Sequence, residues 1–251
     1  MRRALFWTML PFMAPQALWV RRKAPRFSDA AGPASGCIGE GPDRQLIAVG
    51  DSIIAGVGAP TLDQALVGQT ARALAAELDA SVHWHAYGMT GERSAGLVAR
   101  RLSTLPDVDA DYVIVSMGVN DVTGLSTTSE YGENMHAVLR GIRLRYPRAG
   151  IAVAGLPPLG VFPLLPQPLR AFLGMRADTL SRVLSDVVDL HAGVSFVPIN
   201  FEVSPGQFSD DGFHPSPEGY TEFGAAMATA LLTTAAKELR QAPMALRHRS
   251  A

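Results

Sequence analysis

The strongest local chemical signal lies near the C-terminal end of the sequence, where Asp211 stands three residues before His214. Pro215 and Pro217 follow at once and mark a stiff turn. An aspartate at this spacing can bond one ring nitrogen of the histidine and leave the other nitrogen facing a cleft. The pair therefore predicts a general base that activates a nucleophile elsewhere in the chain.

Ser52 is the candidate nucleophile, because it follows Gly50 and Asp51 at the end of an apolar run at 46–49. A serine there would project beyond a strand, near backbone N–H groups that can stabilise negative charge. Taken alone, Gly-Asp-Ser is also a frequent turn tripeptide, in which Asp51 and Ser52 simply cap the turn. Both interpretations are open at this point.

Two further segments offer hydrogen-bond donors for an oxyanion. Gly88 and Gly91 follow a second apolar run, and glycine lets a backbone N–H group approach a ligand closely. Asn120 follows a third run; its amide can donate to a developing oxyanion, while Asp121 can tie the loop to backbone N–H groups. A flexible strand-to-helix turn and a plain Asx turn are the alternatives.

Short apolar runs of strand length alternate with longer helical patterns, and these elements must position the polar residues. The expected strands are 46–50, 82–87, 112–117, 151–155 and 194–199. The expected helices are 62–78, 94–102, 129–146, 169–191 and 217–239. Such alternation predicts a parallel sheet with helices on both faces, because each crossover needs a helix. Ligands of such sheets bind beyond the carboxyl ends of the strands, where these candidates fall.

Local signals predict where two of the helices begin. Thr61 to Gln64 has the spacing of a capping box, and Ser216 before Pro217 offers an N-cap followed by proline at the first helical position.

The composition excludes several classes of protein. A chain of 251 residues with 47% hydrophobic and 18% charged residues predicts one large or at most two small folded domains. With 22 basic against 23 acidic residues, the formal net charge of −1 argues against a nucleic-acid partner. Cys37 is the sole cysteine, so no internal disulfide forms. His83 and His85 alternate on one strand face without a third ligand nearby, and we expect no metal.

The first 27 residues differ from the rest of the chain. Their basic start and apolar middle resemble a signal peptide, but two prolines, the lack of a clear cleavage site and a basic cluster favour retention over secretion. Aromatic residues flanked by arginines predict peripheral membrane contact through residues 1–26, with packing on the domain as the alternative. We therefore expect a cytoplasmic or peripheral membrane location. Residues 28–45 predict a linker, 46–240 the folded domain and 241–251 a basic tail.

Taken together, four segments resemble the sequence blocks of the SGNH (GDSL) hydrolase family in their order and spacing. They are Gly50-Asp51-Ser52, Gly91, Gly118-Val119-Asn120-Asp121 and Asp211-Gly212-Phe213-His214-Pro215. The resemblance covers about residues 46–239. It implies a flavodoxin-like three-layer α/β/α sandwich with a five-stranded parallel sheet, and an enzyme that needs no cofactor.

The resemblance also implies the role of each catalytic residue. Ser52 is the nucleophile, His214 acts as general base and then acid, and Asp211 orients His214. The oxyanion hole is formed by the N–H of Ser52, the N–H of Gly91 and the side chain of Asn120.

Two details near the second block have alternatives. Gly88 is the alternative to Gly91 as oxyanion donor, because an alignment on the first glycine shifts the donor by three residues. Arg93 could favour an anionic substrate or pair with Glu92, and we expect the pairing.

The segment 156–168 is apolar and rich in proline, and it follows the fourth expected strand. It could form one wall of an acyl-chain pocket, which would favour lipid or thioester substrates over polar sugars. Packing over the sheet is the alternative. The expected function is a serine esterase that hydrolyses carboxylic esters through an acyl-enzyme. A deacetylase of sugar acetyl esters and a catalytically silent binding module on the same fold are the alternatives.

Overall fold

A computed structural model of the chain describes residues 13, 15–20, 22, 28–199 and 206–241. In this part the strands are β1 (Ser35–Ile38), β2 (Asp43–Gly50), β3 (Ser81–Gly88), β4 (Tyr112–Ser116), β5 (Gly150–Ala154) and β6 (Val194–Val197). The main helices are α2 (Leu66–Leu78), α5 (Thr128–Arg145), α6 (Leu169–Asp189) and α7 (Pro217–Gln241). Shorter ones are η1 (Leu62–Gln64), α3 (Ser94–Gly96), η2 (Leu97–Arg101), η3 (Leu102–Thr104), α4 (Val119–Thr123) and η4 (Leu159–Val161).

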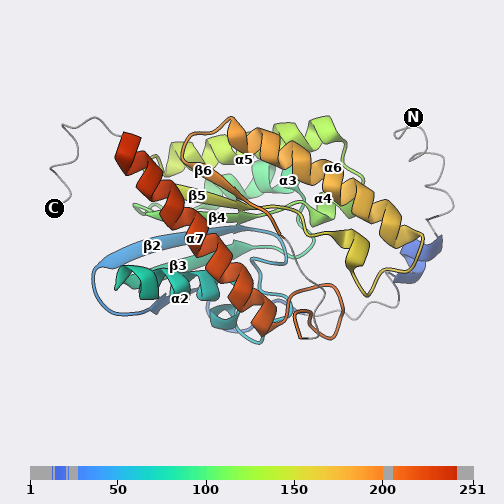
Figure 1. The fold of residues 1–251 in the computed structure, drawn as a ribbon, viewed down its shortest axis with the longest axis horizontal. Coiled ribbons are helices and arrows are strands. Elements are labelled where there is room, and N and C mark those ends of the chain that lie inside the picture. The colour runs from blue at the N-terminus through green and yellow to red at the C-terminus, as the bar shows by residue number, and fades with distance from the viewer. Residues whose placement is uncertain (1–12, 14, 21, 23–27, 200–205, 242–251) are drawn as a thin grey trace.

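The strands form one sheet in the order β1-β3-β2-β4-β5-β6. Every pairing among β2 to β6 is parallel, and their order β3-β2-β4-β5-β6 is that of the flavodoxin-like doubly wound fold. The predicted α/β class and all five predicted strands are confirmed. In Figure 1, α5 and α6 cover one face of this sheet, and α2 and α7 cover the other.

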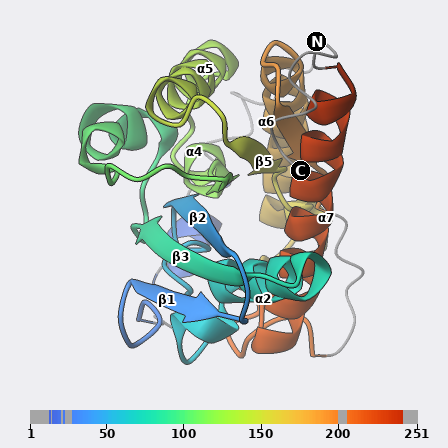
Figure 2. The ribbon, with the colours of Figure 1, turned by 90° about the vertical axis from the view of Figure 1, so that its left-hand side faces the viewer.

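The sheet contains one strand more than predicted. β1 lies inside the segment 28–45, which we expected to be a linker, and it pairs with β3 in the antiparallel direction. This edge strand has only four residues and is not fully buried, so it carries no apolar run that would reveal it. Gly36 within it faces the indole of Trp84, where a β-carbon would overlap the ring. Figure 2 shows β1 at the edge of the sheet beside β3.

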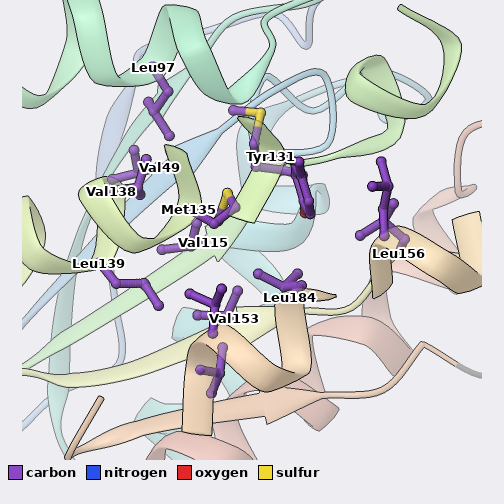
Figure 3. Packing of buried hydrophobic residues seen from close by; sticks show 14 of the residues in the cluster. Val49, Leu97, Val115, Tyr131, Met135, Val138, Leu139, Val153, Leu156 and Leu184 are labelled. Atoms are coloured by element: carbon purple, nitrogen blue, oxygen red, sulfur yellow. The ribbon is translucent and has the colours of Figure 1, made fainter. Parts of the chain in front are cut away.

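The continuous apolar runs of the central strands are explained by two separate cores. Along β2, Ile47 and Val49 face the core under α5 and α6, whereas Leu46 and Ala48 face the core under α2 and α7. A strand buried on both faces has no polar side to alternate with, which explains its unbroken apolar sequence. Figure 3 shows the packing in the first core, where Tyr131 and other α5 side chains meet residues of the sheet and α6.

The helix boundaries were predicted with mixed success. Ser216 Oγ accepts a hydrogen bond from the Gly219 N–H at 3.1 Å, which confirms the predicted N-cap of α7. The capping box predicted at Thr61 is wrong, because the Thr61 side chain makes no capping bond and residues 62–64 form a separate 3-10 turn. The observed capping box joins Thr127 and Glu130 at the start of α5. The helix predicted at 94–102 is instead α3, the π-helical turn η2 and the start of η3.

The described N-terminal residues pack on the domain beside the start of α6. Met13 is buried in the first core, and the Gln16 side chain bonds the Gln167 carbonyl at 3.0 Å and the Leu169 N–H at 3.2 Å. The rest of the predicted segment 1–27, and residues 242–251 of the predicted tail, lie outside the described residues. Within the described residues, no helix has the length and apolar character needed to cross a membrane. Peripheral membrane contact through residues 1–26 stays a prediction.

A test of the packing at the end of β3 compares two strand glycines. A β-carbon at Gly88 would overlap the backbone of Ile54 and Ala55, whereas one at Gly150 would meet Tyr112 Cδ1 at an ordinary 3.7 Å. We expect Gly88→Ala to lower the free energy of unfolding by about 1–3 kcal/mol or more. Gly150→Ala should change it by less than about 1 kcal/mol. Urea unfolding of both variants checks this, and equal losses would contradict it.

Candidate active site

Ser52 sits on a helical turn directly after β2, at the carboxyl edge of the sheet. The turn is closed by hydrogen bonds from the Ala55 N–H to the Asp51 carbonyl and from the Val57 N–H to the Ser52 carbonyl, both 3.0 Å. The last residue of the strand, Gly50, has no room for a side chain, because a β-carbon there would overlap the Ser116 carbonyl of β4. The Ser52 N–H has no hydrogen-bond partner among the described residues, so it is available to a ligand.

The hydroxyl of Ser52 and the ring of His214 are joined across 162 residues of sequence. His214 Nε2 lies 3.1 Å from Ser52 Oγ, and His214 Nδ1 lies 2.6 Å from Asp211 Oδ2. Both distances are within hydrogen-bond range. The structure therefore brings together the three residues that the sequence predicts as nucleophile, base and orienting carboxylate.

The carboxylate of Asp211 is fixed by several donors besides the histidine ring. Its Oδ1 accepts from the backbone N–H groups of Phe213 at 2.7 Å and His214 at 2.8 Å, and from Ser209 Oγ at 2.8 Å. Burial alone would raise the pKa of Asp211, but the hydrogen bonds from His214 and Phe213 outweigh it and lower the pKa. The group is thus an anion that holds one ring nitrogen of His214 as an N–H donor.

The predicted oxyanion donors lie on neighbouring loops. Gly91 has a φ of 81° and is exposed, and its N–H has no partner within the described chain. Asn120 Nδ2 donates to the Glu92 carbonyl at 2.9 Å, which leaves its second N–H for a ligand. Gly88 instead ends β3, opposite Gly50 and pressed against Ala55. The geometry favours Gly91 over Gly88 as the exposed donor.

Asp121 ties the second and third loops together, as predicted for this residue. Its fully buried carboxylate accepts from the Ser94 N–H at 3.0 Å and from the hydroxyls of Ser94 and Ser126, both at 2.8 Å. Asn134 Nδ2 adds a bond to Ser94 Oγ at 3.2 Å. Ser94, Ser126 and Asn134 could not be identified from the sequence, because these residues come together only when the loops are adjacent in the fold.

An apolar cavity lies beside the serine turn; its empty space is about 400 Å³, part of which is open to solvent. It is lined by Asp51, Ile53, Ser116, Met117, Val119, Gly155, Leu156, Pro157, Phe162, Ile199, Phe213, Pro215 and Phe223. The proline-rich segment 156–168 supplies Leu156, Pro157 and Phe162 to this lining, while Leu156 and Phe162 also pack in the first core, so both interpretations of the segment apply. The ring of Phe162 also packs edge-on against Phe213, the residue next to His214.

The expected pairing of Arg93 with Glu92 is wrong. Glu92 Oε1 instead bonds Arg100 Nη2 at 2.6 Å, and Glu92 Oε2 lies 3.9 Å from Arg101 Nε. Residues 97–101 form a π-helical turn, so Arg100 reaches back over eight residues to the buried glutamate. Periodicity does not predict such a turn, which is why the nearer Arg93 was the expected partner.

His83 and His85 on β3 do not belong to a cluster that could bind a metal ion within the described residues. His83 Nε2 bonds Asp43 Oδ1 at 2.9 Å, and no cluster of three or more metal-binding side chains occurs in the part of the chain that the structure describes.

Here a serine is hydrogen-bonded to a histidine, and the histidine is hydrogen-bonded to a carboxylate, at the carboxyl edge of a doubly wound sheet. This arrangement defines a serine hydrolase of the α/β type. The model of the GDSL-like Lipase/Acylhydrolase family matches residues 48–221. The chain belongs to this family and is an SGNH-type serine hydrolase.

Individual relatives agree with this assignment. The GDSL-like esterase Rv1075c of Mycobacterium tuberculosis is 28% identical over 250 residues, which covers 89% of this chain and 75% of that protein. Among solved structures, TesA superimposes with a TM-score of 0.62 at 21% identity, covering 76% of this chain and 99% of TesA. A family 3 carbohydrate esterase from Clostridium thermocellum gives 0.60 at 17% identity, covering 78% and 98%. At these identities the two structures show the fold alone.

Asp51 provides a test of the electrostatics next to Ser52. Burial raises the pKa of Asp51 from 3.8 to about 7, although the Ile53 N–H and the charge of His214 act to lower it. The folded protein therefore holds a proton that the unfolded chain has lost, and this contribution to stability disappears as the pH rises through about 7. Asp51→Asn removes the titration. We expect the Tm of Asp51→Asn, relative to wild type, to rise between pH 4 and pH 8.

Thermal unfolding of the two proteins at matched ionic strength measures this difference. A Tm difference that is the same at both ends of the pH range would show that Asp51 ionises as an ordinary carboxyl.

Proposed function

We propose that this protein is an esterase that hydrolyses carboxylic esters with apolar acyl groups through an acyl-enzyme on Ser52. One observation carries the proposal: the chain of hydrogen bonds from Asp211 through His214 to Ser52 ends beside a cavity with an apolar lining.

In the first half of the reaction, His214 Nε2 takes the proton of Ser52 as its oxygen attacks the ester carbonyl. Asp211 stabilises the resulting imidazolium, because its anionic carboxylate already bonds the other ring nitrogen. The tetrahedral intermediate collapses when His214 gives the proton to the leaving alcohol. An acyl-serine remains.

In the second half, water attacks the acyl-serine while His214 takes a proton from it. His214 then gives this proton to the Ser52 oxygen as its bond to the acyl carbon breaks, and the carboxylic acid leaves. Negative charge on the carbonyl oxygen develops twice, and in both steps the N–H groups of Ser52 and Gly91 and the amide of Asn120 are the proposed donors. Losing one donor of this kind typically costs about 10²- to 10³-fold in rate.

The acyl group is proposed to occupy the apolar cavity. Of its lining residues, only Asp51 and Ser116 have polar side chains, which suits a hydrocarbon chain better than a sugar. Lipid esters and thioesters are both compatible with this lining. The alternative, removal of acetyl groups from sugars, has support only from similarity of fold to carbohydrate esterases.

Hydrolysis of p-nitrophenyl esters from acetate to palmitate, by wild type and Ser52→Ala, tests the proposal. We expect a chain longer than acetate to be preferred, and kcat to fall by at least about 10³-fold in Ser52→Ala. Ser129→Ala, an exposed serine on α5, is the control and should retain the wild-type rate.

Equal rates in wild type and Ser52→Ala, or no hydrolysis of any ester in the series, would overturn the serine mechanism. A sharp preference for acetate would favour the deacetylase alternative.

The place of the acyl chain is tested by Phe162→Leu, which enlarges the cavity while keeping it apolar. We expect the optimum of kcat/KM to move to longer acyl chains. Phe172→Leu on α6 is the matched control, because Phe172 is also a buried phenylalanine but does not line the cavity. If the acyl-chain optimum moves equally in both variants, the change comes from looser packing of the core in general and not from the size of the cavity.

A further inference from the structure

A second cleft, polar in character, opens next to the oxyanion donors. Its empty space is about 650 Å³, part of which is open to solvent, and it is lined by Gly91, Glu92, Arg93, Ala95, Gly96 and Arg100. The linings of the two clefts are connected through a proposed donor: Val119 lines the apolar cavity, its neighbour Asn120 bonds the Glu92 carbonyl, and Glu92 lines the polar cleft. A substrate held in the oxyanion hole therefore has one apolar and one polar direction in which to extend.

The carboxylate of Glu92 can balance the charge of only one of the two arginines that line the polar cleft. Its side chain is buried, and Oε1 is bonded to Arg100 Nη2 at 2.6 Å. Gly96 makes room for this pair, since a β-carbon at Gly96 would overlap atoms of both side chains. One carboxylate is thus matched by one guanidinium, and a second positive charge is left over in the lining.

That second charge is Arg93. Its side chain is exposed, and no carboxylate of the described chain lies within salt-bridge distance of it. It lies against the C-terminal end of α4, the short helix that carries Asn120: a β-carbon built on Gly124 would lie 2.9 Å from Arg93 Cδ and 3.2 Å from Nη1. Arg93 therefore presents an unpaired guanidinium beside the helix that supplies an oxyanion donor.

We propose that Arg93 binds an anionic group, a carboxylate or a phosphate, on the alcohol portion of the ester. This inference rests on the proposed esterase function, because it assumes that the acyl portion fills the apolar cavity. The alcohol oxygen is bonded to the same carbonyl carbon and must then leave in another direction, toward the polar cleft. Only Glu92 separates Gly91 from Arg93, so their α-carbons are at most about 7 Å apart. A guanidinium at this range binds an oxyanion with two parallel hydrogen bonds.

The test uses aryl esters that differ only in the para substituent of the alcohol. A 4-carbamoylphenyl ester is neutral, and 4-carboxyphenyl and 4-(phosphonomethyl)phenyl esters are anionic; all carry the acyl chain that wild type prefers. The proteins are wild type, Arg93→Gln and the control Arg182→Gln, whose side chain bonds only residues of its own helix α6.

We expect Arg93→Gln to lower the ratio of kcat/KM for an anionic ester to that for the neutral ester by about 10- to 100-fold. The loss should appear mainly in KM, and it should shrink at high salt. Arg182→Gln should leave the ratio unchanged. If the ratio falls for only one of the two anionic esters, that ester carries the anionic group that Arg93 prefers.

A binding measurement gives a readout that does not depend on turnover. Binding of 4-hydroxybenzoate, an anion, and of the neutral 4-hydroxybenzamide is measured by NMR titration. Compared with wild type, Arg93→Gln should bind 4-hydroxybenzoate more weakly and 4-hydroxybenzamide equally well. An unchanged ratio of rates together with unchanged binding of 4-hydroxybenzoate overturns the Arg93 site. If the neutral ester is still hydrolysed in a Ser52-dependent way, the esterase proposal survives that result. Hydrolysis that is independent of Ser52 defeats the esterase proposal instead.

Discussion

The active site depends on how closely the backbone can approach itself at the end of β2. Gly50 lies against the Ser116 carbonyl of β4, and Gly88 of β3 lies against the turn that carries Ser52. Neither position has room for a β-carbon. Because three strand ends converge without side chains between them, the serine turn is fixed on two sides by backbone. The orientation of the Ser52 hydroxyl toward His214 follows from this packing.

Buried carboxylates form a second layer of organisation around the serine. Asp211 orients the histidine, Asp121 joins the loops that carry Gly91 and Asn120, and Glu92 anchors the turn through Arg100. Each accepts at least one hydrogen bond from a side chain: Asp211 from His214, Asp121 from Ser94 and Glu92 from Arg100. Buried charges of this kind are tolerated only when they are bonded, so each one fixes the loop that bonds it. A site built on loops thereby acquires the precision that is usual for helices and strands.

Much of this arrangement could be predicted from the sequence, for identifiable reasons. The central strands β2, β4 and β5 are buried on both faces over most of their length and carry apolar runs, which revealed them and the edge at which ligands bind, whereas the partly exposed β3 and β6 were indicated by short segments of strand length. Ser52 was found because its motif stands at a strand end, and Asp211 and His214 because of their three-residue spacing in a turn with two prolines. What could not be predicted depended on contacts between distant segments. β1 has too few buried residues to show periodicity, and the partner of Glu92 was decided by a π-helical turn rather than by sequence distance.

The bonds made by Gln16 show that the folding unit is larger than the conserved pattern of the family. Its side chain holds the backbone at Gln167 and Leu169, just after the loop that lines the apolar cavity. The family match begins at residue 48, inside β2, and ends at residue 221, near the start of α7. A protein cut at those limits would lose β1, the first half of β2, most of α7 and the Gln16 brace. The ends of the family match and the ends of the folded domain therefore lie at different residues of this chain.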